Sequence, residues 1–156
     1  MSEIDGYVLL PGEGREIPMG AFTMHVLSDA AGSGGAFTLL EADEPPGFGP
    51  PIHVHEDCAE AFYVLQGEYV IFLGDQEFLC PAGSYVYIPQ GAVHGFRVGR
   101  VPSRKLNLYS PAAMVAYFDG LAAAAAQGAT LDDEALVQLA EESHIRVLGP
   151  VPEGYA

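Results

Sequence analysis

The sequence predicts an all-β domain, a sandwich or small barrel, followed by two α-helices. Short apolar runs, separated by turn-forming residues, continue from the start of the chain to about residue 110. The chain holds 19 glycines and 12 prolines in 156 residues, and its composition becomes alanine-rich after Ser110-Pro111. This length fits one domain with its own core. We therefore place a β-domain over residues 1–110 and a C-terminal helical extension, packed on the same domain, over residues 111–156.

The β-domain is interpreted as a series of short strands, each bounded by turn residues. The expected strands are Tyr7–Leu10, Ala21–Leu27, Ala36–Ala42, Ile52–His55, Glu60–Gln66, Tyr69–Leu73, Gln76–Leu79, Tyr85–Ile88, His94–Val98 and Lys105–Tyr109. We expect Asp29–Gly35 to be a flexible turn. The stretch Pro45–Pro51 cannot continue a ladder, because proline lacks a backbone donor.

The C-terminal extension is expected to form two helices and a final strand. Ser110 is a suitable N-cap and is followed by proline, which predicts a helix from there to about Ala126. Thr130 would cap a second helix, Leu131–Glu142, and Ile145–Leu148 is expected to be a strand. An apolar stripe on a helix is usually a core face, so we interpret both helices as packing elements.

The charge balance excludes several classes of partner. Six basic residues stand against 21 acidic ones, a formal net charge of -15. Such a surface repels phosphate backbones and anionic lipids, so we expect no nucleic-acid and no membrane partner. The acidic N-terminus lacks the layout of a signal peptide, which favours a cytoplasmic location. Cys58 and Cys80 form no C-x-x-C motif; we expect reduced thiols, with a single disulfide left open.

Three histidines and a glutamate form the most informative pattern. His53 and His55 alternate within an expected strand and therefore share a face. Glu60 opens the next strand, and His94 opens a later one. Imidazole nitrogens and a carboxylate oxygen together make a site for a divalent transition metal. A lone histidine is more often a solvated or core residue, but the joint spacing of these four favours a metal site.

This spacing resembles the cupin superfamily. The pattern G-x5-H-x-H-x4-E-x6-G is met by Gly47, His53, His55, Glu60 and Gly67. The pattern G-x5-P-x-G-x2-H-x3-N is met by Gly83, Pro89, Gly91 and His94, with Val98 in place of the final asparagine. The segments that look like the quercetin 2,3-dioxygenase-like branch of single-domain cupins are Gly49–His55, Glu60–Glu68, Val86–His94 and Val147–Pro150. The resemblance implies a cupin-type double-stranded β-helix, a small jelly-roll barrel, in which His53, His55, Glu60 and His94 bind one metal.

The proposed ligand set narrows the choice of metal. Three nitrogens and one carboxylate oxygen do not suit magnesium or calcium, which prefer oxygen ligands. Catalytic zinc usually keeps three protein ligands and a water. Iron(II), manganese, nickel and cobalt accept five or six ligands and so leave positions open. We favour iron(II), because mixed nitrogen and oxygen sites with open positions suit oxygen chemistry; manganese, nickel, cobalt and zinc remain alternatives.

Residues that share strand parity with the ligands are expected to line an apolar, aromatic interior that suits a flat organic substrate. By this parity the candidate substrate-binding residues are Phe62, Val64, Phe72 and Phe96, and the aromatic residues Tyr85 and Tyr87 are added to them. Four of the six basic residues, from Arg97 to Lys105, follow His94 closely. Such a cluster is usually a solvated face, and we interpret it so.

The resemblance implies a metal-dependent dioxygenase, an oxidoreductase that combines O2 with a small flavonol- or phenol-like metabolite inside the barrel. It also implies that Glu60 doubles as a catalytic base when it leaves the metal. Two alternatives stay open: a metal-dependent cyclase or isomerase in secondary metabolism, and a non-catalytic cupin that binds a small molecule. Because open sheet edges favour association, we expect a homodimer.

Overall fold

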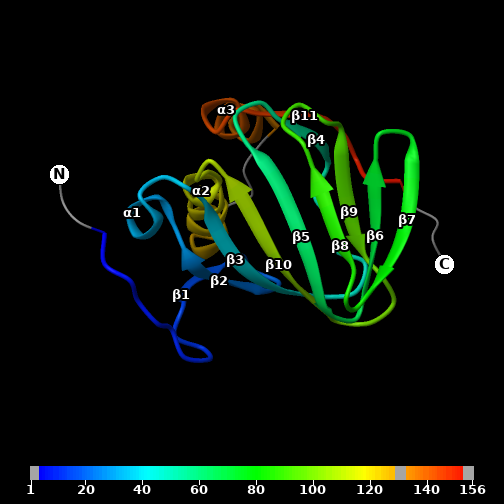
Figure 1. The fold of residues 1–156 in the computed structure, drawn as a ribbon. Helices are drawn as coiled ribbons and strands as arrows, with labels where there is room; N and C mark the ends of the chain where they lie inside the picture. Colours follow the sequence, from blue (N-terminus) through cyan, green and yellow to red (C-terminus); the bar gives the residue numbers. More distant parts are fainter. Residues whose placement is uncertain (1–3, 129–132, 153–156) are drawn as a thin grey trace.

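The computed structural model describes residues 4–128 and 133–152, which form two facing antiparallel sheets flanked by helices (Figure 1). The strands are β1 (Arg15–Pro18), β2 (Thr23–Ser28), β3 (Thr38–Glu44), β4 (Ile52–His55), β5 (Ala59–Gln66), β6 (Glu68–Leu73), β7 (Gln76–Pro81), β8 (Tyr85–Ile88), β9 (His94–Val98), β10 (Ser103–Ser110) and β11 (Ile145–Gly149). The helices are α1 (Ala30–Ser33), α2 (Val115–Ala126) and α3 (Asp133–Glu142).

The chain winds back and forth between the two sheets. The larger sheet has the order β1-β2-β3-β10-β5-β8, and the smaller has the order β11-β4-β9-β6-β7. Side chains along β3 and β10 alternate between buried and partly exposed, as expected for strands with one face on a core. The architecture confirms the prediction of an all-β cupin-type jelly roll with C-terminal helices.

Two apolar clusters fill the molecule. The cluster between the sheets contains Phe62, Val64, Tyr69, Ile71, Val86, Ile88, Phe96 and Val98. The other cluster joins α2 to the larger sheet, where Phe118 and Ala122 pack with Leu40 and Tyr109. Helix α2 lies behind the β1–β3 side of that sheet (Figure 1) and thus covers the part of its inner face that the smaller sheet leaves open.

The N-terminal region differs from the sequence expectation. The predicted strand Tyr7–Leu10 is an exposed segment outside both sheets, whereas Arg15–Pro18 forms the unpredicted strand β1. Strand β1 buries only Ile17, so its sequence carries too little apolar periodicity to predict it. The segment Asp29–Gly35, expected to be a flexible turn, contains the one-turn helix α1. Asp29 caps this helix, because its side chain accepts a hydrogen bond from Gly32 N at 2.8 Å.

The first C-terminal helix begins later than predicted. Helix α2 starts at Val115, because β10 continues through Ser110, whose hydroxyl donates to the carbonyl of Ala36 at 3.0 Å. The Thr130 cap predicted for the second helix lies outside the described residues. The final strand extends the smaller sheet: β11 pairs with β4 and places Val147 opposite His53.

The described cysteines are both free thiols. Cys58 is buried, and burial together with the neighbouring Asp57 raises its pKa to about 12. Within residues 4–128 and 133–152, no helix combines the length and apolar character needed to cross a membrane.

Candidate metal centre in the barrel

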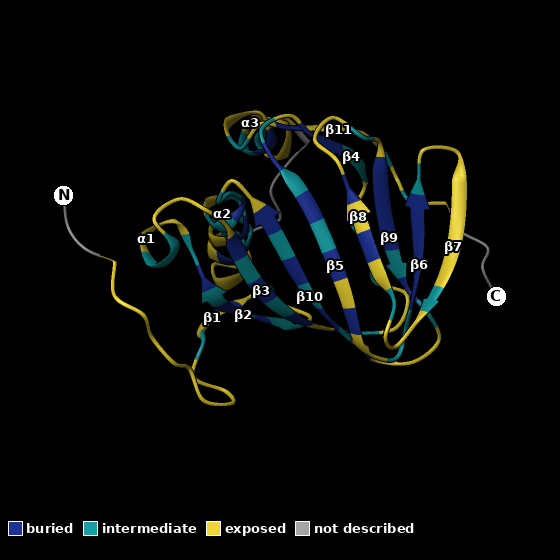
Figure 2. Cartoon of the chain, in the orientation of Figure 1, coloured by how far each residue is buried: buried dark blue, intermediate teal, exposed yellow. Residues whose placement is uncertain are grey.

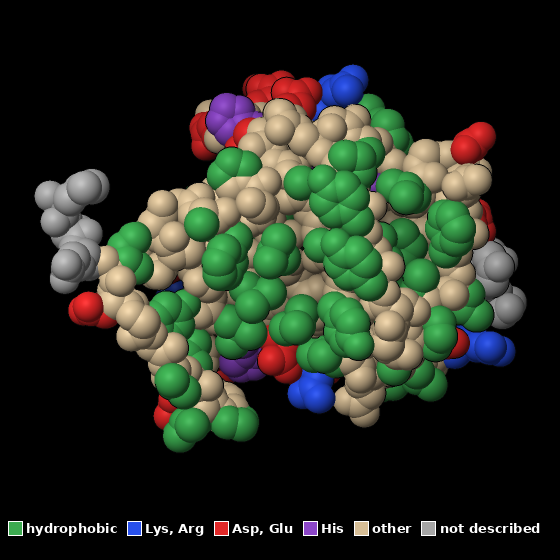
Figure 3. All heavy atoms as spheres, in the orientation of Figure 1, with side chains coloured by type: hydrophobic (Ala, Val, Ile, Leu, Met, Phe, Trp, Pro, Cys, Tyr) green, Lys and Arg blue, Asp and Glu red, His purple; other side chains and the backbone are tan. Residues whose placement is uncertain are grey.

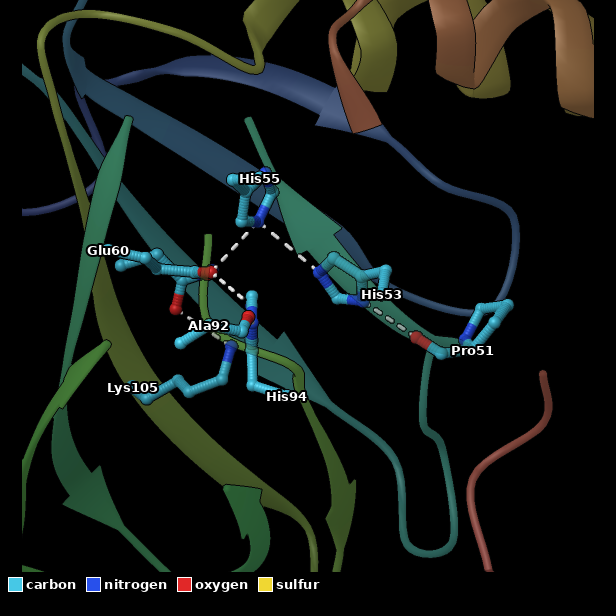
Figure 4. Close-up of polar contacts among 8 residues, drawn as sticks. Pro51, His53, His55, Glu60, Ala92, His94 and Lys105 are labelled. Atoms are coloured by element: carbon cyan, nitrogen blue, oxygen red, sulfur yellow. Dashed lines mark hydrogen bonds and ion pairs between the residues drawn. The ribbon is translucent and has the colours of Figure 1, made fainter. Parts of the chain in front are cut away.

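The four predicted ligands meet inside the barrel (Figure 4). Strand β4 supplies His53 and His55, strand β5 supplies Glu60, and strand β9 supplies His94. His53 lies directly opposite His94 in the β4–β9 pair. One ligand atom from each of the four residues lies within 4.8 Å of all the others. The topology therefore brings together residues that are up to 41 positions apart in the sequence.

The carboxylate of Glu60 contacts two of the three histidines of the cluster. Its Oε2 lies 2.9 Å from His55 Nε2 and 2.8 Å from His94 Nε2. His53 Nε2 lies 3.2 Å from His55 Nε2. Glu60, His55 and His94 are buried, while His53 is partly exposed. His53 therefore marks the side of the cluster that is nearest to solvent.

Backbone carbonyls orient two of the imidazole rings. The Nδ1–H of His53 donates to the Pro51 carbonyl at 2.6 Å, and the Nδ1–H of His94 donates to the Ala92 carbonyl at 2.9 Å. Because a carbonyl only accepts, Nδ1 of each ring carries a hydrogen; Nε2 of a neutral His53 then carries the lone pair, whereas Nε2 of His94 faces the Glu60 carboxylate. This is the arrangement that outer partners of metal-binding histidines usually impose.

The cluster also shifts the pKa values of its members. Burial would raise the pKa of Glu60, but the hydrogen bonds from His55 and His94 lower it well below its ordinary value. Burial would lower the pKa of His94, but the hydrogen bond to Glu60 raises it. For His53, burial and the nearby His94 lower the pKa to about 4. The ring of His53 is thus neutral, and available as a ligand, over most of the pH range.

The donor set fits one transition metal ion. Nitrogen and oxygen ligands lie about 2.1 Å from such an ion, so ligand atoms of one site lie roughly 3–4 Å from each other. The measured separations of 2.8, 2.9 and 3.2 Å, and the upper limit of 4.8 Å, are close to that spacing. Three imidazoles and a single carboxylate suit iron, manganese, nickel, cobalt or zinc better than magnesium or calcium.

Three further polar side chains face the interior from β10, and the sequence analysis missed them. Tyr109 is buried, lies directly opposite Glu60 in the β5–β10 pair, and packs its ring 5.7 Å from that of His55. Burial and the charge of Glu60 raise the pKa of Tyr109. Asn107 and Lys105 follow at the next inward positions, and Figure 4 shows Lys105 extending toward the cluster. The alternation of residues 105, 107 and 109 in one strand was the signal that could have found them.

Lys105 corrects the interpretation of the basic cluster as a wholly solvated face. Its side chain is fully buried, and Nζ lies 2.7 Å from Asn107 Oδ1 and 3.1 Å from Glu44 Oε1. The ammonium group also lies 4.2 Å from the ring centre of Phe96 and 4.7 Å from that of Phe62. The barrel interior thus holds a buried ion pair within an aromatic cage.

The candidate substrate-binding residues separate into two groups. Phe62, Val64 and Phe96 belong to the apolar cluster between the sheets. Phe72 is buried but pairs with Gly95 of β9, so it lies on the face opposite His94 and not on the interior wall. The interior position expected for Tyr85 and Tyr87 is also corrected. Both are exposed on the outer face of β8. The inward residues of this strand are Val86 and Ile88.

Comparison with known proteins agrees with this fold. Residues 40–102 match the Cupin domain family. The chain is 30% identical over 92 residues to quercetin 2,3-dioxygenase of Bacillus subtilis (strain 168). That match covers 59% of the chain but only 27% of the relative, so the chain spans little more than a quarter of the length of that enzyme.

Solved structures share the fold. A cupin described as RmlC-like, from Shewanella frigidimarina, superposes with a TM-score of 0.60 at 16% identity, over 69% of this chain and 93% of that one. The polyketide cyclase RemF from Streptomyces resistomycificus gives a TM-score of 0.59 at 24% identity, over 68% of this chain and 80% of that one. A predicted oxalate decarboxylase from Thermotoga maritima gives a TM-score of 0.59 at 22% identity, over 67% of this chain and 99% of that one.

The two-sheet barrel and its interior cluster of three histidines and one glutamate define the class: a small jelly-roll protein with a candidate metal centre. The chain therefore has the cupin fold, and over part of its length it is similar to quercetin 2,3-dioxygenase.

Proposed function

We propose that this cupin is a metal-dependent dioxygenase that acts on a small aromatic metabolite bearing an enol or phenol group. The convergence of His53, His55, His94 and Glu60 on one point inside the barrel carries the proposal. The sequence similarity to quercetin 2,3-dioxygenase supports the reaction class. Iron(II) is the ion that we favour, because mixed nitrogen and oxygen sites with open positions suit oxygen chemistry.

The three histidines would hold the ion through Nε2, and Glu60 through its carboxylate. The bound ion would supply Lewis acidity that favours the anionic form of a substrate hydroxyl. The substrate would reach the cluster past His53, the ligand nearest to solvent. Phe62 and Phe96, whose ring centres lie 5.7 Å apart, would contact the flat ring of the substrate and exclude water.

Glu60 supplies the carboxylate of the cluster. We propose that it is the base that accepts the proton of the substrate hydroxyl. Tyr109 lies directly opposite Glu60 in the β5–β10 pair and would keep the carboxylate directed toward the three histidines. A histidine that binds metal through Nε2 no longer donates a hydrogen bond from that atom. Metal binding would therefore replace the two hydrogen bonds to Glu60 by a contact with the ion, and Glu60 would act as the base when its carboxylate leaves the ion.

The test is oxygen uptake by protein reconstituted with iron(II), manganese, nickel, cobalt or zinc, using quercetin and a panel of phenols and enols as substrates. We expect metal-dependent uptake that is lost in Glu60→Gln and kept in Glu77→Gln, which neutralises an exposed carboxylate on β7. Equal product formation without oxygen would contradict a dioxygenase and indicate a cyclase or isomerase. A tightly bound ligand that is returned unchanged would indicate a binding protein.

A further inference from the structure

A row of cross-strand neighbours leads from the metal cluster to the surface. Val147 of β11 lies opposite His53 of β4, and His53 lies opposite His94 of β9. Directly opposed residues point to the same face of a sheet, so all three side chains face the barrel interior. His94 is 2% exposed, His53 is partly exposed and Val147 is 43% exposed. Figure 2 shows β9 buried, whereas exposed residues lie along α3. Solvent therefore reaches the cluster from the Val147 side.

A hollow of about 350 Å³ opens beside this row, between α3 and β11, which pack against each other (Figure 1). This volume is within the range of small-molecule sites. Val147 lines the hollow and lies opposite His53. Ile145 lines it too and lies opposite His55. The hollow is therefore separated from the metal cluster only by the inner side of β11 and β4.

The hollow is already formed, because the turn between α3 and β11 is tied to the chain just after β4. The carbonyl of His144 accepts a hydrogen bond from Glu56 N at 2.9 Å. Arg146 Nε lies 3.4 Å from Glu56 Oε1. His144 has a φ of 59°, a left-handed conformation that a non-glycine residue keeps only where its surroundings impose it. These contacts fix the position of α3 relative to β4.

The hollow has apolar walls and an acidic rim. Its apolar lining residues are Val137, Ala140, Ile145 and Val147. Its charged lining residues are two carboxylates and one guanidinium, Glu56, Glu141 and Arg146. Figure 3 shows acidic side chains and a histidine over α3, with a basic side chain nearby. An anionic group would be repelled here, because the whole chain also carries a net charge of -15. The hollow therefore suits an uncharged, apolar group.

From these observations we infer that the hollow binds the part of the substrate that extends out of the metal cluster, and that Val147 is a specificity-determining residue at its inner edge. The inference rests on the proposed function, which places the reacting hydroxyl of the substrate at the cluster. It narrows the substrate class to a phenol or enol that carries an uncharged apolar substituent, such as a further ring. That substituent lies between α3 and β11, in contact with Val137 and Val147.

The test measures binding under nitrogen, so that it does not depend on turnover. The two probes are 3-hydroxyflavone, which carries an enol hydroxyl and an apolar phenyl group, and 3-hydroxychromone, the same compound without the phenyl group. Their absorbance is followed during titration with iron(II)-loaded protein. We expect 3-hydroxyflavone to bind at least about tenfold more tightly, because burying about 60 Å² of apolar surface at about 25 cal/mol per Å² corresponds to that factor.

Two pairs of matched variants locate the phenyl group. Val137→Trp fills the hollow from α3, and its control is Leu136→Trp, at the neighbouring exposed residue outside the hollow. We expect Val137→Trp to remove the preference for 3-hydroxyflavone and to leave the binding of 3-hydroxychromone unchanged. Val147→Trp narrows the path beside His53 and should weaken 3-hydroxyflavone binding at least about tenfold. Its control is Leu148→Trp, at the next residue of β11, which is 48% exposed and outside the hollow.

Metal content and far-UV circular dichroism show that each variant is loaded and folded. A preference for 3-hydroxyflavone that is lost in Val137→Trp and Val147→Trp and kept in both controls would support the inference. This result would stand even if oxygen uptake failed and the proposed dioxygenase reaction were abandoned. Equal affinity for the two probes, no binding of either, or a preference that survives in both folded, metal-loaded valine variants would overturn the inference, even where oxygen uptake supports a dioxygenase.

Discussion

The ion pair of Lys105 and Glu44 offers a sharp test of how the barrel interior is organised. Lys105 Nζ lies 3.1 Å from Glu44 Oε1, and both side chains are completely buried. The Tyr69 hydroxyl donates to the same Glu44 oxygen at 2.9 Å, while Glu44 Oε2 has no hydrogen-bond partner among the described residues. Lys105→Met keeps much of the side-chain volume but removes the charge. It would leave the Glu44 carboxylate buried and uncompensated.

The expected cost of that single substitution is large. Removing one partner of a buried ion pair typically costs about 3–5 kcal/mol, because the remaining charge stays desolvated. For a chain of this size, 1 kcal/mol shifts Tm by roughly 2–4 °C, so Tm should fall by about 6–20 °C. The double variant Lys105→Met/Glu44→Gln removes both charges and keeps an acceptor for Tyr69. Its stability should lie within about 1 kcal/mol of the unaltered protein.

Urea unfolding and differential scanning calorimetry measure both quantities. The control is Arg104→Met, which alters the neighbouring residue on the opposite face of β10, where the guanidinium pairs with Glu41 at 3.2 Å in contact with solvent. An exposed pair contributes about 0–1 kcal/mol, so this variant should change little. The reasoning would be refuted if Lys105→Met cost no more than Arg104→Met, or if the double variant were less stable than Lys105→Met.

Three further outcomes are expected. Gly67 has a φ of 79°, and a Cβ there would lie 2.8 Å from the Pro102 carbonyl oxygen, so Gly67→Ala should lower the free energy of unfolding by about 1–3 kcal/mol in urea titrations. The pKa of Cys58 is raised to about 12, so its thiol should resist iodoacetamide at neutral pH until the protein unfolds, as peptide mass mapping would show. The pKa of His53 is lowered to about 4, so the unfolded chain binds this proton at higher pH than the native metal-free protein does. Stability should therefore fall as pH drops from about 6.5 to 4, and His53→Ala should flatten that slope in urea titrations at a series of pH values.

The sequence predicted the strands that carry the site, because their signals are local. The expected ranges Ile52–His55, Tyr85–Ile88 and His94–Val98 coincide with β4, β8 and β9. Within one strand, alternate residues share a face whatever the rest of the fold does. The spacing of His53 and His55 therefore predicted their common direction, and the fold brought Glu60 and His94 to meet them.

Features that depend on how strands pair could not be predicted in the same way. Phe72 was assigned to the interior, but the register of β6 against β9 sets it opposite Gly95, on the face away from His94. No local pattern encodes that register. Tyr85 and Tyr87 were assigned to the interior for their aromatic character, whereas Val86 and Ile88 occupy the inward positions.

Lys105 shows a second limit of sequence reasoning. Lysine is almost never fully buried without a partner, and a nearby run of basic residues favoured a solvated face. The residue that compensates it, Glu44, is about sixty positions earlier in the sequence and comes into contact through the β3–β10 pair. The sequence around a residue does not indicate a partner that lies on a strand far away in the chain. The same holds for Tyr109, whose partner Glu60 lies directly opposite it on β5.

The central claim is that the three histidines and Glu60 hold one transition metal ion. Its most direct test is metal content by inductively coupled plasma mass spectrometry, on protein purified without an affinity tag or added metal and again after anaerobic reconstitution. We predict close to one transition metal ion per chain, and its loss in a folded His53→Ala/His55→Ala variant. Protein that holds no metal even after reconstitution, or a variant that binds metal as well as the unaltered chain, would contradict the account.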